Sequence, residues 1–149
     1  MLCQFTFENY KSFKDEATLD LCAEKIKEHE SSLIIDPIDG EAFLPAISIY
    51  GPNGGGKSNV LEAFVYLSHK ILSPVISLSA SESSKDEAYA QRKMRTFNDR
   101  FSDGREKHFI FDEKCRGLPT KFDVLFRIDS TEYRYQISLL GANVAEENL

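Results

Sequence analysis

Hydrophobic and polar residues alternate along the first part of the chain, residues 2–22. Phe5 and Phe7 are flanked by polar residues, and the same two-residue period returns over residues 17–21. Because successive side chains of a strand point to opposite faces of a sheet, each stretch predicts a strand with one apolar face. The polar residues 9–15 between them predict a turn, so we expect the chain to open with a β-hairpin.

One long helix is expected in the middle of the chain. Residues 43–50 are a short apolar run that stops at Gly51, a pattern typical of a buried strand that leads into a turn. Over residues 57–72 apolar side chains recur at the spacing of one helix face, and Pro74 is expected to end the helix. The charged and aperiodic residues 24–41 predict a loop.

The last third of the chain returns to strands. Residues 122–128 and 133–139 alternate cleanly on either side of a turn at residues 129–131, which predicts an antiparallel hairpin. Residues 109–111 predict a further short strand. The predicted fold class is therefore α/β, with a strand-rich antiparallel portion around one helix.

Residues 73–107 differ in composition from both flanks. They are rich in Ser, Lys, Glu and Asp, and residues 85–95 could form a polar helix. We expect an insertion or a mobile connection here rather than a domain boundary. A chain of 149 residues is long enough for one domain with a core but not comfortably for two, so residues 1–149 are expected to form a single domain.

The net charge and the spacing of the cysteines argue against several classes of function. A net charge of −6 argues against binding nucleic acid by electrostatics alone, because a phosphate backbone needs a basic surface. Cys3, Cys22 and Cys115 are widely spaced, so neither a disulfide framework nor a zinc site is expected. No apolar run approaches the ~20 residues of a membrane span. These features favour a cytoplasmic protein without a membrane partner.

A phosphate-loop motif is the most specific feature of the sequence. Residues 51–58 fit the pattern Gly-x-x-x-x-Gly-Lys-Ser/Thr and read Gly-Pro-Asn-Gly-Gly-Gly-Lys-Ser. Glycines let the backbone curl so that amide groups point at phosphate oxygens, and the following helix adds its positive end. Lys57 would neutralise the β- and γ-phosphates, and the Ser58 hydroxyl would ligate Mg²⁺. A chance match is expected in roughly one of a few hundred such chains, so we expect ATP and Mg²⁺ as cofactors.

The loop and its surroundings resemble a known group of ATPases. Residues 51–63, above all the Pro-Asn-Gly within the loop and Asn59 after it, resemble the first nucleotide motif of ABC-type ATPases of the SMC, RecF and OLD group. Residues 9–13, Asn-Tyr-Lys-Ser-Phe, resemble the turn after the first strand in that group. The resemblance implies a P-loop NTPase fold, with residues 1–149 forming one incomplete ABC-type lobe.

More narrowly, the chain resembles bacterial OLD-like ATPases, called AAA family proteins, of abortive infection and antiphage defence. Residues 13–19 are similar to their opening segment, and residues 122–126 and 133–135 to two of their later strands. The resemblance implies that Lys11 and Ser12 contact the nucleotide, although Lys11 could equally be a solvated lysine in a hairpin turn. The candidate nucleotide-binding residues are Lys11, Ser12, Asn53, Gly54, Gly55, Gly56, Lys57, Ser58 and Asn59, and the candidate metal ligand is Ser58.

The rest of an ABC-type catalytic site is missing from these motifs. In this group an apolar strand ending in Asp-Glu, a signature helix and a switch histidine lie in a second lobe. Residues 109–113 mimic that strand and residues 101–105 faintly mimic the signature, but no room is left between them for the signature helix. We interpret Asp112 and Glu113 as solvated acids at a strand end. Neither Gln91 nor Gln136 is assigned as the Mg²⁺-contacting glutamine, and the three histidines, His29, His69 and His108, form no metal pattern.

Three functions stay open at this point. The first is an ATP-binding lobe linked to DNA maintenance or antiphage defence. For it the resemblance implies ATP-dependent dimerisation, DNA or a nuclease as partners, and ATP hydrolysis only when another lobe supplies the missing motifs. The second is a small P-loop kinase-type phosphotransferase with Asp112 or Glu113 at its metal. Its phosphate lid would use Arg92, Arg95, Arg100 and Arg105. The third is a non-catalytic module in which nucleotide stabilises the fold.

Overall fold

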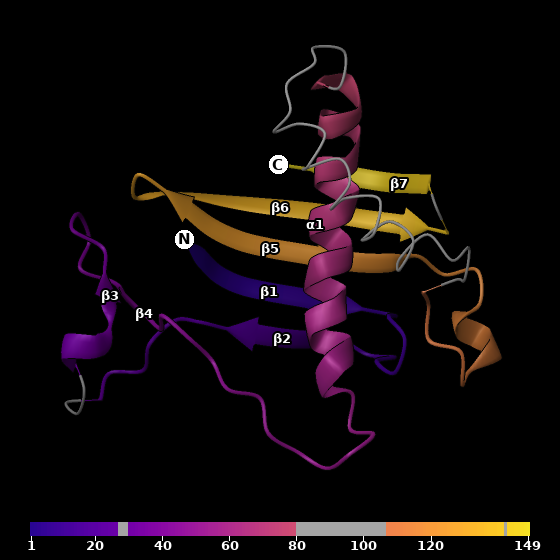
Figure 1. The fold of residues 1–149 in the computed structure, drawn as a ribbon, viewed down its shortest axis with the longest axis horizontal. Coiled ribbons are helices and arrows are strands. Elements are labelled where there is room, and N and C mark those ends of the chain that lie inside the picture. The colour runs from indigo at the N-terminus through magenta and orange to yellow at the C-terminus, as the bar shows by residue number, and fades with distance from the viewer. Residues whose placement is uncertain (27–29, 80–106, 142) are drawn as a thin grey trace, which may run out of the picture. The chain divides into compact units, whose positions relative to one another are not determined.

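The computed structural model describes residues 1–26, 30–79, 107–141 and 143–149 (Figure 1). They fall into two compact units, and each is described here by itself. The first unit joins residues 1–59 to residues 107–149, and the second comprises residues 60–106. The predicted polar helix at 85–95, the signature-like residues 101–105, Gln91, His29 and the four lid arginines lie outside the described residues.

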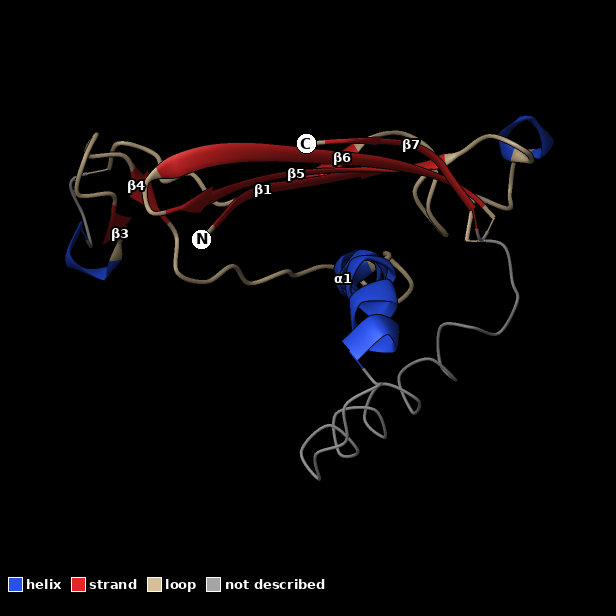
Figure 2. Cartoon of the chain, turned by 90° about the horizontal axis from the view of Figure 1, so that it is seen from above, coloured by secondary structure: helices blue, strands red, loops and turns tan. Residues whose placement is uncertain are grey.

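One antiparallel sheet dominates the first unit. Its strands are β1 (Leu2–Glu8), β2 (Ala17–Asp20), β5 (Thr120–Ile128), β6 (Thr131–Leu140) and β7 (Asn143–Asn148). They lie side by side in the order β2-β1-β5-β6-β7, and every neighbouring pair runs antiparallel. Figure 2 shows the sheet edge-on as a single curved layer. Both predicted hairpins, β1–β2 and β5–β6, are confirmed by this pairing.

Aromatic rings form the core on one face of this sheet. In the register of the strands Phe7 lies opposite Phe122, which in turn lies opposite Ile137. The Phe5 and Phe122 rings stack with their centroids 6.2 Å apart, and Tyr10 meets Phe122 edge-on at 5.9 Å. Each such fully buried side chain contributes about 1.5–3 kcal/mol by leaving water. This packing joins β1, β5, β6 and the turn that follows β1.

Within the first unit, Arg127 joins a small second sheet to the main sheet. The second sheet pairs β3 (Ile34–Ile35) with β4 (Ala42–Phe43), next to a short 3₁₀ turn at Glu30–Ser32. The buried Arg127 guanidinium on β5 lies 5.2 Å from the Phe43 ring centroid. It also forms ion pairs with four carboxylates, those of Asp36, Asp39, Glu41 and Glu132. Removing the arginine would leave the buried Asp36 carboxylate without its cation, which is costly.

The helix α1 (Lys57–Ser79) begins where the sequence predicts but ends later. It continues past Pro74, whereas the sequence predicts an end near residue 72. A proline removes one backbone donor from a helix, and an established helix can tolerate that loss as a local kink. In the second unit, Ala63, Tyr66 and Leu67 are buried positions of this helix. No helix in the described part of the chain is long and apolar enough to cross a membrane.

Two predicted strands are wrong. Only Ala42–Phe43 is a strand in the first region, and residues 45–50 form no hydrogen bond among the described residues. An apolar run becomes a buried strand only where a neighbouring strand pairs with it, and here Tyr50 stays 89% exposed. Residues 109–111 are also irregular, because the Phe109 amide donates to the Asn9 side chain instead of to a strand, at 2.9 Å.

The aromatic core provides a stability test. Phe122 is 2% exposed, whereas Phe111 is 78% exposed. Phe122→Ala leaves a cavity between β1 and β6, so we expect it to lower the free energy of unfolding by about 3–5 kcal/mol. Phe111→Ala should change it by less than about 0.5 kcal/mol. Urea unfolding followed by circular dichroism measures both, and equal losses would show that the rings do not form the core.

Candidate phosphate-binding site

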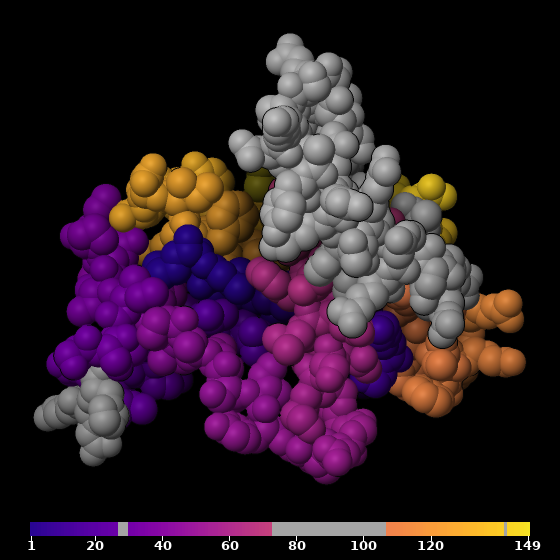
Figure 3. All heavy atoms as spheres, viewed as in Figure 1, coloured from indigo at the N-terminus to yellow at the C-terminus, as the bar shows by residue number. Residues whose placement is uncertain are grey.

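The loop over residues 51–58 has the backbone of a tight, glycine-dependent turn. Gly54 and Gly56 have φ angles of +82° and +83°, in the left-handed region that side chains rarely adopt. α1 begins immediately afterwards, at Lys57. The segment leading from β4 into the helix, purple to magenta in Figure 3, lies at the surface. The loop is therefore held in an uncommon conformation and is open to a ligand.

Several amide groups of this loop lack an acceptor. Gly55 donates to the Pro52 carbonyl at 3.2 Å, and Asn59 donates to the Gly56 carbonyl at 2.9 Å. Among the described residues no acceptor is found for the backbone amides of Asn53, Gly54, Gly56, Lys57 and Ser58. Consecutive unpaired amides at the start of a helix form a binding place for an anion such as phosphate.

The Lys57 side chain folds back onto the loop. Its Nζ donates to the Gly51 carbonyl at 2.8 Å and to the Pro52 carbonyl at 2.7 Å. An ammonium group has three donors and is mobile enough to exchange carbonyl oxygens for phosphate oxygens. In this conformation the ammonium charge of Lys57 lies at the loop and is hydrogen-bonded to two of the loop's own carbonyl groups.

The turn after β1 is in direct contact with the loop. The Asn59 side-chain amide donates to the Ser12 hydroxyl at 2.8 Å. A Cβ atom added to Gly56 would lie 2.9 Å from Ser12 Oγ and 3.1 Å from Phe13 Cζ. The structure therefore brings the candidates Ser12, Gly56 and Asn59 together, from segments almost fifty residues apart. Only a residue without a side chain fits at Gly56.

Lys11 belongs to the same turn. Its φ is +48°, and its backbone amide donates to the Lys107 carbonyl at 2.7 Å. Its ammonium group lies 6.0 Å from the centroid of the Tyr10 ring. The contact predicted between Lys11 and a nucleotide stays a prediction.

Asp112, the first residue of the Asp-Glu pair, takes part in local structure. Asp112 caps the short 3₁₀ helix Glu113–Cys115 by accepting from the Lys114 amide at 2.9 Å. Its other oxygen forms an ion pair with Lys14 at 2.7 Å, and this hydrogen bond from Lys14 lowers the pKa of Asp112. Both carboxylate oxygens are thus occupied, at a 3₁₀ turn rather than at the predicted strand end. The interpretation of Asp112 and Glu113 as non-catalytic acids stays a prediction.

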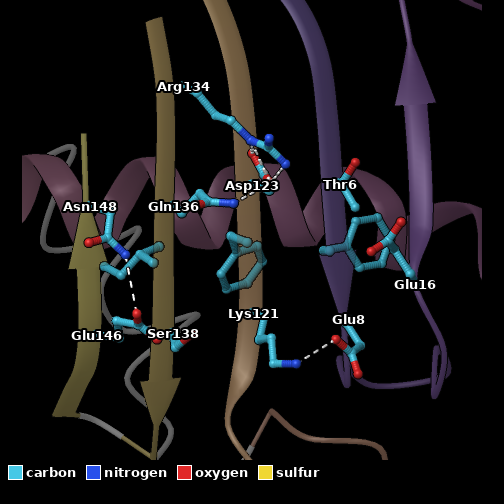
Figure 4. A pocket seen from close by; sticks show the side chains of 13 residues that line it. Thr6, Glu8, Glu16, Lys121, Asp123, Arg134, Gln136, Ser138, Glu146 and Asn148 are labelled. Carbon is cyan, nitrogen blue, oxygen red and sulfur yellow. Dashed lines mark hydrogen bonds and ion pairs between the residues drawn. The ribbon is translucent and has the colours of Figure 1, made fainter.

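Gln136 belongs to a polar groove on the sheet. The groove has a volume of about 420 Å³ and is lined by side chains of β1, β5, β6 and β7 (Figure 4). Gln136 donates to Asp123 at 2.7 Å, and Arg134 binds the same carboxylate at 2.6 Å. Lys121 pairs with Glu8 across the groove at 3.0 Å. Four of the charged or amide side chains of the groove, Asp123, Arg134, Lys121 and Gln136, are therefore already bonded to other protein groups.

The residues fit phosphate better than they fit a complete metal site. The Ser58 hydroxyl is exposed and can supply one oxygen to Mg²⁺. No group of three His, Cys, Asp or Glu residues that could hold a metal occurs within the described ranges. Any Mg²⁺ here would therefore take its other ligands from the nucleotide and from water, as is usual for this ion.

Comparison with known protein families decides the classification. A family model described as "AAA domain, putative AbiEii toxin, Type IV TA system" matches residues 47–148. The chain belongs to this AAA-domain family. Membership implies a P-loop NTPase and supports an ATPase-like, nucleotide-binding function. Searches of curated proteins and of solved structures find no match to this AAA domain.

The sequence did not indicate two residues that organise this AAA domain. Asn9 is buried and binds several backbone groups about a hundred residues away, and Arg127 holds the acidic segment before the loop. Asn9 appeared only as one letter of a turn, and Arg127 as one polar position of an alternating strand. In the sequence, Asn9 and Arg127 are each recognisable only as a polar residue near the end of a predicted strand. That position does not tell which residues they bind.

Replacing Gly56 tests the contact between turn and loop. Gly56→Ala combines the left-handed φ with a clash against Ser12, so the loop or the turn must shift. We expect ATP affinity to fall at least about tenfold and stability to fall by about 1–2 kcal/mol. Gly117→Ala is the matched control, because Gly117 has a φ of +79° but open space around its Cβ position.

The two variants are compared by titration with a fluorescent ATP analogue and by urea unfolding. Gly117→Ala should lose a similar amount of stability and keep its ATP affinity. Equal ATP affinity in both variants would contradict the importance of the close approach at Gly56.

Proposed function

We propose that this chain is the ATP-binding lobe of an ABC-type ATPase of the OLD, RecF and SMC group. The observation that carries the proposal is the set of unpaired amides between Asn53 and Ser58, next to the Lys57 ammonium. The likeness of residues 9–13 to the first turn of that group gains weight from the contact between Ser12 and Asn59. The family match supports the P-loop and the AAA-type domain.

The loop residues would bind Mg·ATP in separate roles. The unpaired amides would donate hydrogen bonds to the β-phosphate oxygens. Lys57 would leave the Gly51 and Pro52 carbonyls to neutralise the β- and γ-phosphates. Ser12 and Asn59 would border the triphosphate from the side of the turn, together with Lys11. Mg²⁺, when bound at Ser58, would neutralise charge between the phosphates and fix their orientation.

ATP hydrolysis would require residues from another lobe. Within the described ranges, Asp112 of the Asp-Glu pair closest to the family's pattern caps a 3₁₀ helix and is paired with Lys14. A general base and donors for the transition state would thus come from a downstream lobe or a partner subunit. Binding to such a lobe through ATP, with DNA or a nuclease as further partners, is part of this proposal, as is a cytoplasmic role in antiphage defence or DNA maintenance.

The kinase alternative finds less support in the fold. A P-loop kinase core alternates parallel strands with helices, whereas all four strand pairings of the main sheet are antiparallel. One of its two candidate metal ligands, Asp112, is bound to Lys14. A non-catalytic nucleotide-binding module would use the same loop and differs only in lacking ATP-dependent association.

Lys57→Ala tests the proposed function. Loss of the charge that faces the phosphates should weaken Mg·ATP binding by about ten- to a hundredfold or more. Lys121→Ala, which removes an exposed lysine paired with Glu8 on the sheet, should bind ATP normally. Isothermal titration measures both affinities, and undiminished ATP binding by Lys57→Ala would overturn the proposal.

Turnover by the same proteins separates the alternatives. The proposal expects ATP binding by the unaltered chain without release of inorganic phosphate above the level of Lys57→Ala. Phosphate release that Lys57→Ala abolishes would show that this chain carries its own catalytic groups.

A further inference from the structure

Among the described residues near the candidate site, Asn9 has the most extensively hydrogen-bonded polar side chain, although it does not contact the phosphate loop. It is 4% exposed, and its φ is +53°, a conformation that asparagine tolerates better than most residues. Its Oδ1 accepts from the Phe109 amide at 2.9 Å. Its Nδ2 donates to the carbonyls of Leu118, Pro119 and Cys115, at 3.0, 3.3 and 3.4 Å.

The backbone of Asn9 is anchored as well. Its carbonyl accepts from the buried Thr120 hydroxyl at 2.8 Å, and its amide donates to the Lys14 carbonyl at 3.2 Å. Two further contacts hold the same turn against residues 107–120. The Lys11 amide donates to the Lys107 carbonyl at 2.7 Å, and Lys14 pairs with Asp112 at the same distance. The turn is therefore fixed on one side by a segment distant in sequence.

The opposite side of this turn carries the residues that contact the loop. Tyr10 and Phe13 exchange backbone hydrogen bonds of 2.9 and 2.8 Å, which makes the turn a short closed unit. Ser12 lies within this unit and binds Asn59. At Gly56 the spacing leaves no room for a Cβ atom, so even a small displacement of the turn changes the loop's surroundings.

We infer, on the basis of the proposed nucleotide binding, that Asn9 is a positioning residue for the phosphate site. It sets the place of the Lys11–Ser12 turn against Gly56 and Asn59 by binding residues 109–119. Coupling between two sites is reciprocal, so nucleotide in the loop stabilises the hydrogen bonds of Asn9. The side chain must be an amide, because it accepts from one backbone amide while it donates to carbonyls.

The substitution Asn9→Asp tests the role of the Asn9 side chain with the smallest change in its size. It keeps the size and the acceptor for Phe109 but places a carboxylate oxygen against the Leu118 and Pro119 carbonyls. We expect about tenfold weaker Mg·ATP binding, measured by isothermal titration. Asn148→Asp on β7 is the matched control, since that side chain is exposed and, within the described part of the chain, bonds only to Glu146. It should bind ATP like the unaltered chain.

Two further readouts separate positioning from general destabilisation. If Asn9 acts through the turn, Asn9→Asp combined with Ser12→Ala should weaken binding by less than the product of the two single effects. In addition, saturating Mg·ATP should slow hydrogen exchange of the Phe109 amide at least about threefold in the unaltered chain and leave it unchanged in Lys57→Ala. Independent effects and an unchanged Phe109 amide in the unaltered chain would overturn the inference.

The experiments distinguish failure of the proposed nucleotide binding from failure of the inferred role of Asn9. If the unaltered chain does not bind Mg·ATP, the proposed function fails first. If it binds and folded Asn9→Asp binds equally well, only the role of Asn9 fails. Should Asn9→Asp not fold, Thr120→Val takes its place, because it removes the 2.8 Å bond to the Asn9 carbonyl and keeps the side-chain volume. It should weaken binding by about threefold, and unaltered affinity in this variant would overturn the inference.

Discussion

The pairing of Phe7 with Phe122 across β1 and β5 is the constraint on which the rest of the first unit depends. A shift of one residue would turn every ring of β1 to the polar face, so burial of the rings fixes the register. That register determines where β1 ends, and Asn9 follows directly. The turn at residues 10–13 is then placed beside Gly56 by packing, since the Phe13 ring meets Phe7 edge-on at 5.0 Å. The phosphate loop thus takes its position from the aromatic core.

The sequence predicted the parts of this structure that depend on local pattern. The alternation around Phe5 and Phe122 predicted both hairpins, and the glycine spacing predicted the loop and the start of α1 at Lys57. Pattern failed where a tertiary partner decides the outcome. Residues 45–50 have strand composition but no pairing strand, and Phe109 gives its amide to Asn9. A prediction from neighbouring residues in the sequence cannot identify such partners, because they lie far away along the chain.

Charge has two different roles in the first unit. Around Arg127, one buried guanidinium organises four carboxylates and so fastens the β3–β4 sheet to the main sheet. In the groove of the main sheet, by contrast, Asp123, Arg134 and Gln136 satisfy one another at the surface, where ion pairs contribute little to stability. The net charge of −6 conceals this difference, because it reports an average and not where each charge is needed.

The segment before the phosphate loop, residues 45–50, affects the tendency of two molecules to associate through their strands. β7, at one edge of the main sheet, carries Glu146 and Glu147, and like charges of this kind discourage edge-to-edge pairing of two molecules. Residues 45–50 are uncharged, contain two isoleucines and have no backbone pairing among the described residues, and Pro45 is their one residue of a protective kind. Short neutral segments rich in isoleucine nucleate β-aggregates when they contain no proline, so Pro45 confines this tendency to residues 46–50. A charged substitution at Ile47 would therefore reduce the tendency of this segment to pair with a second molecule.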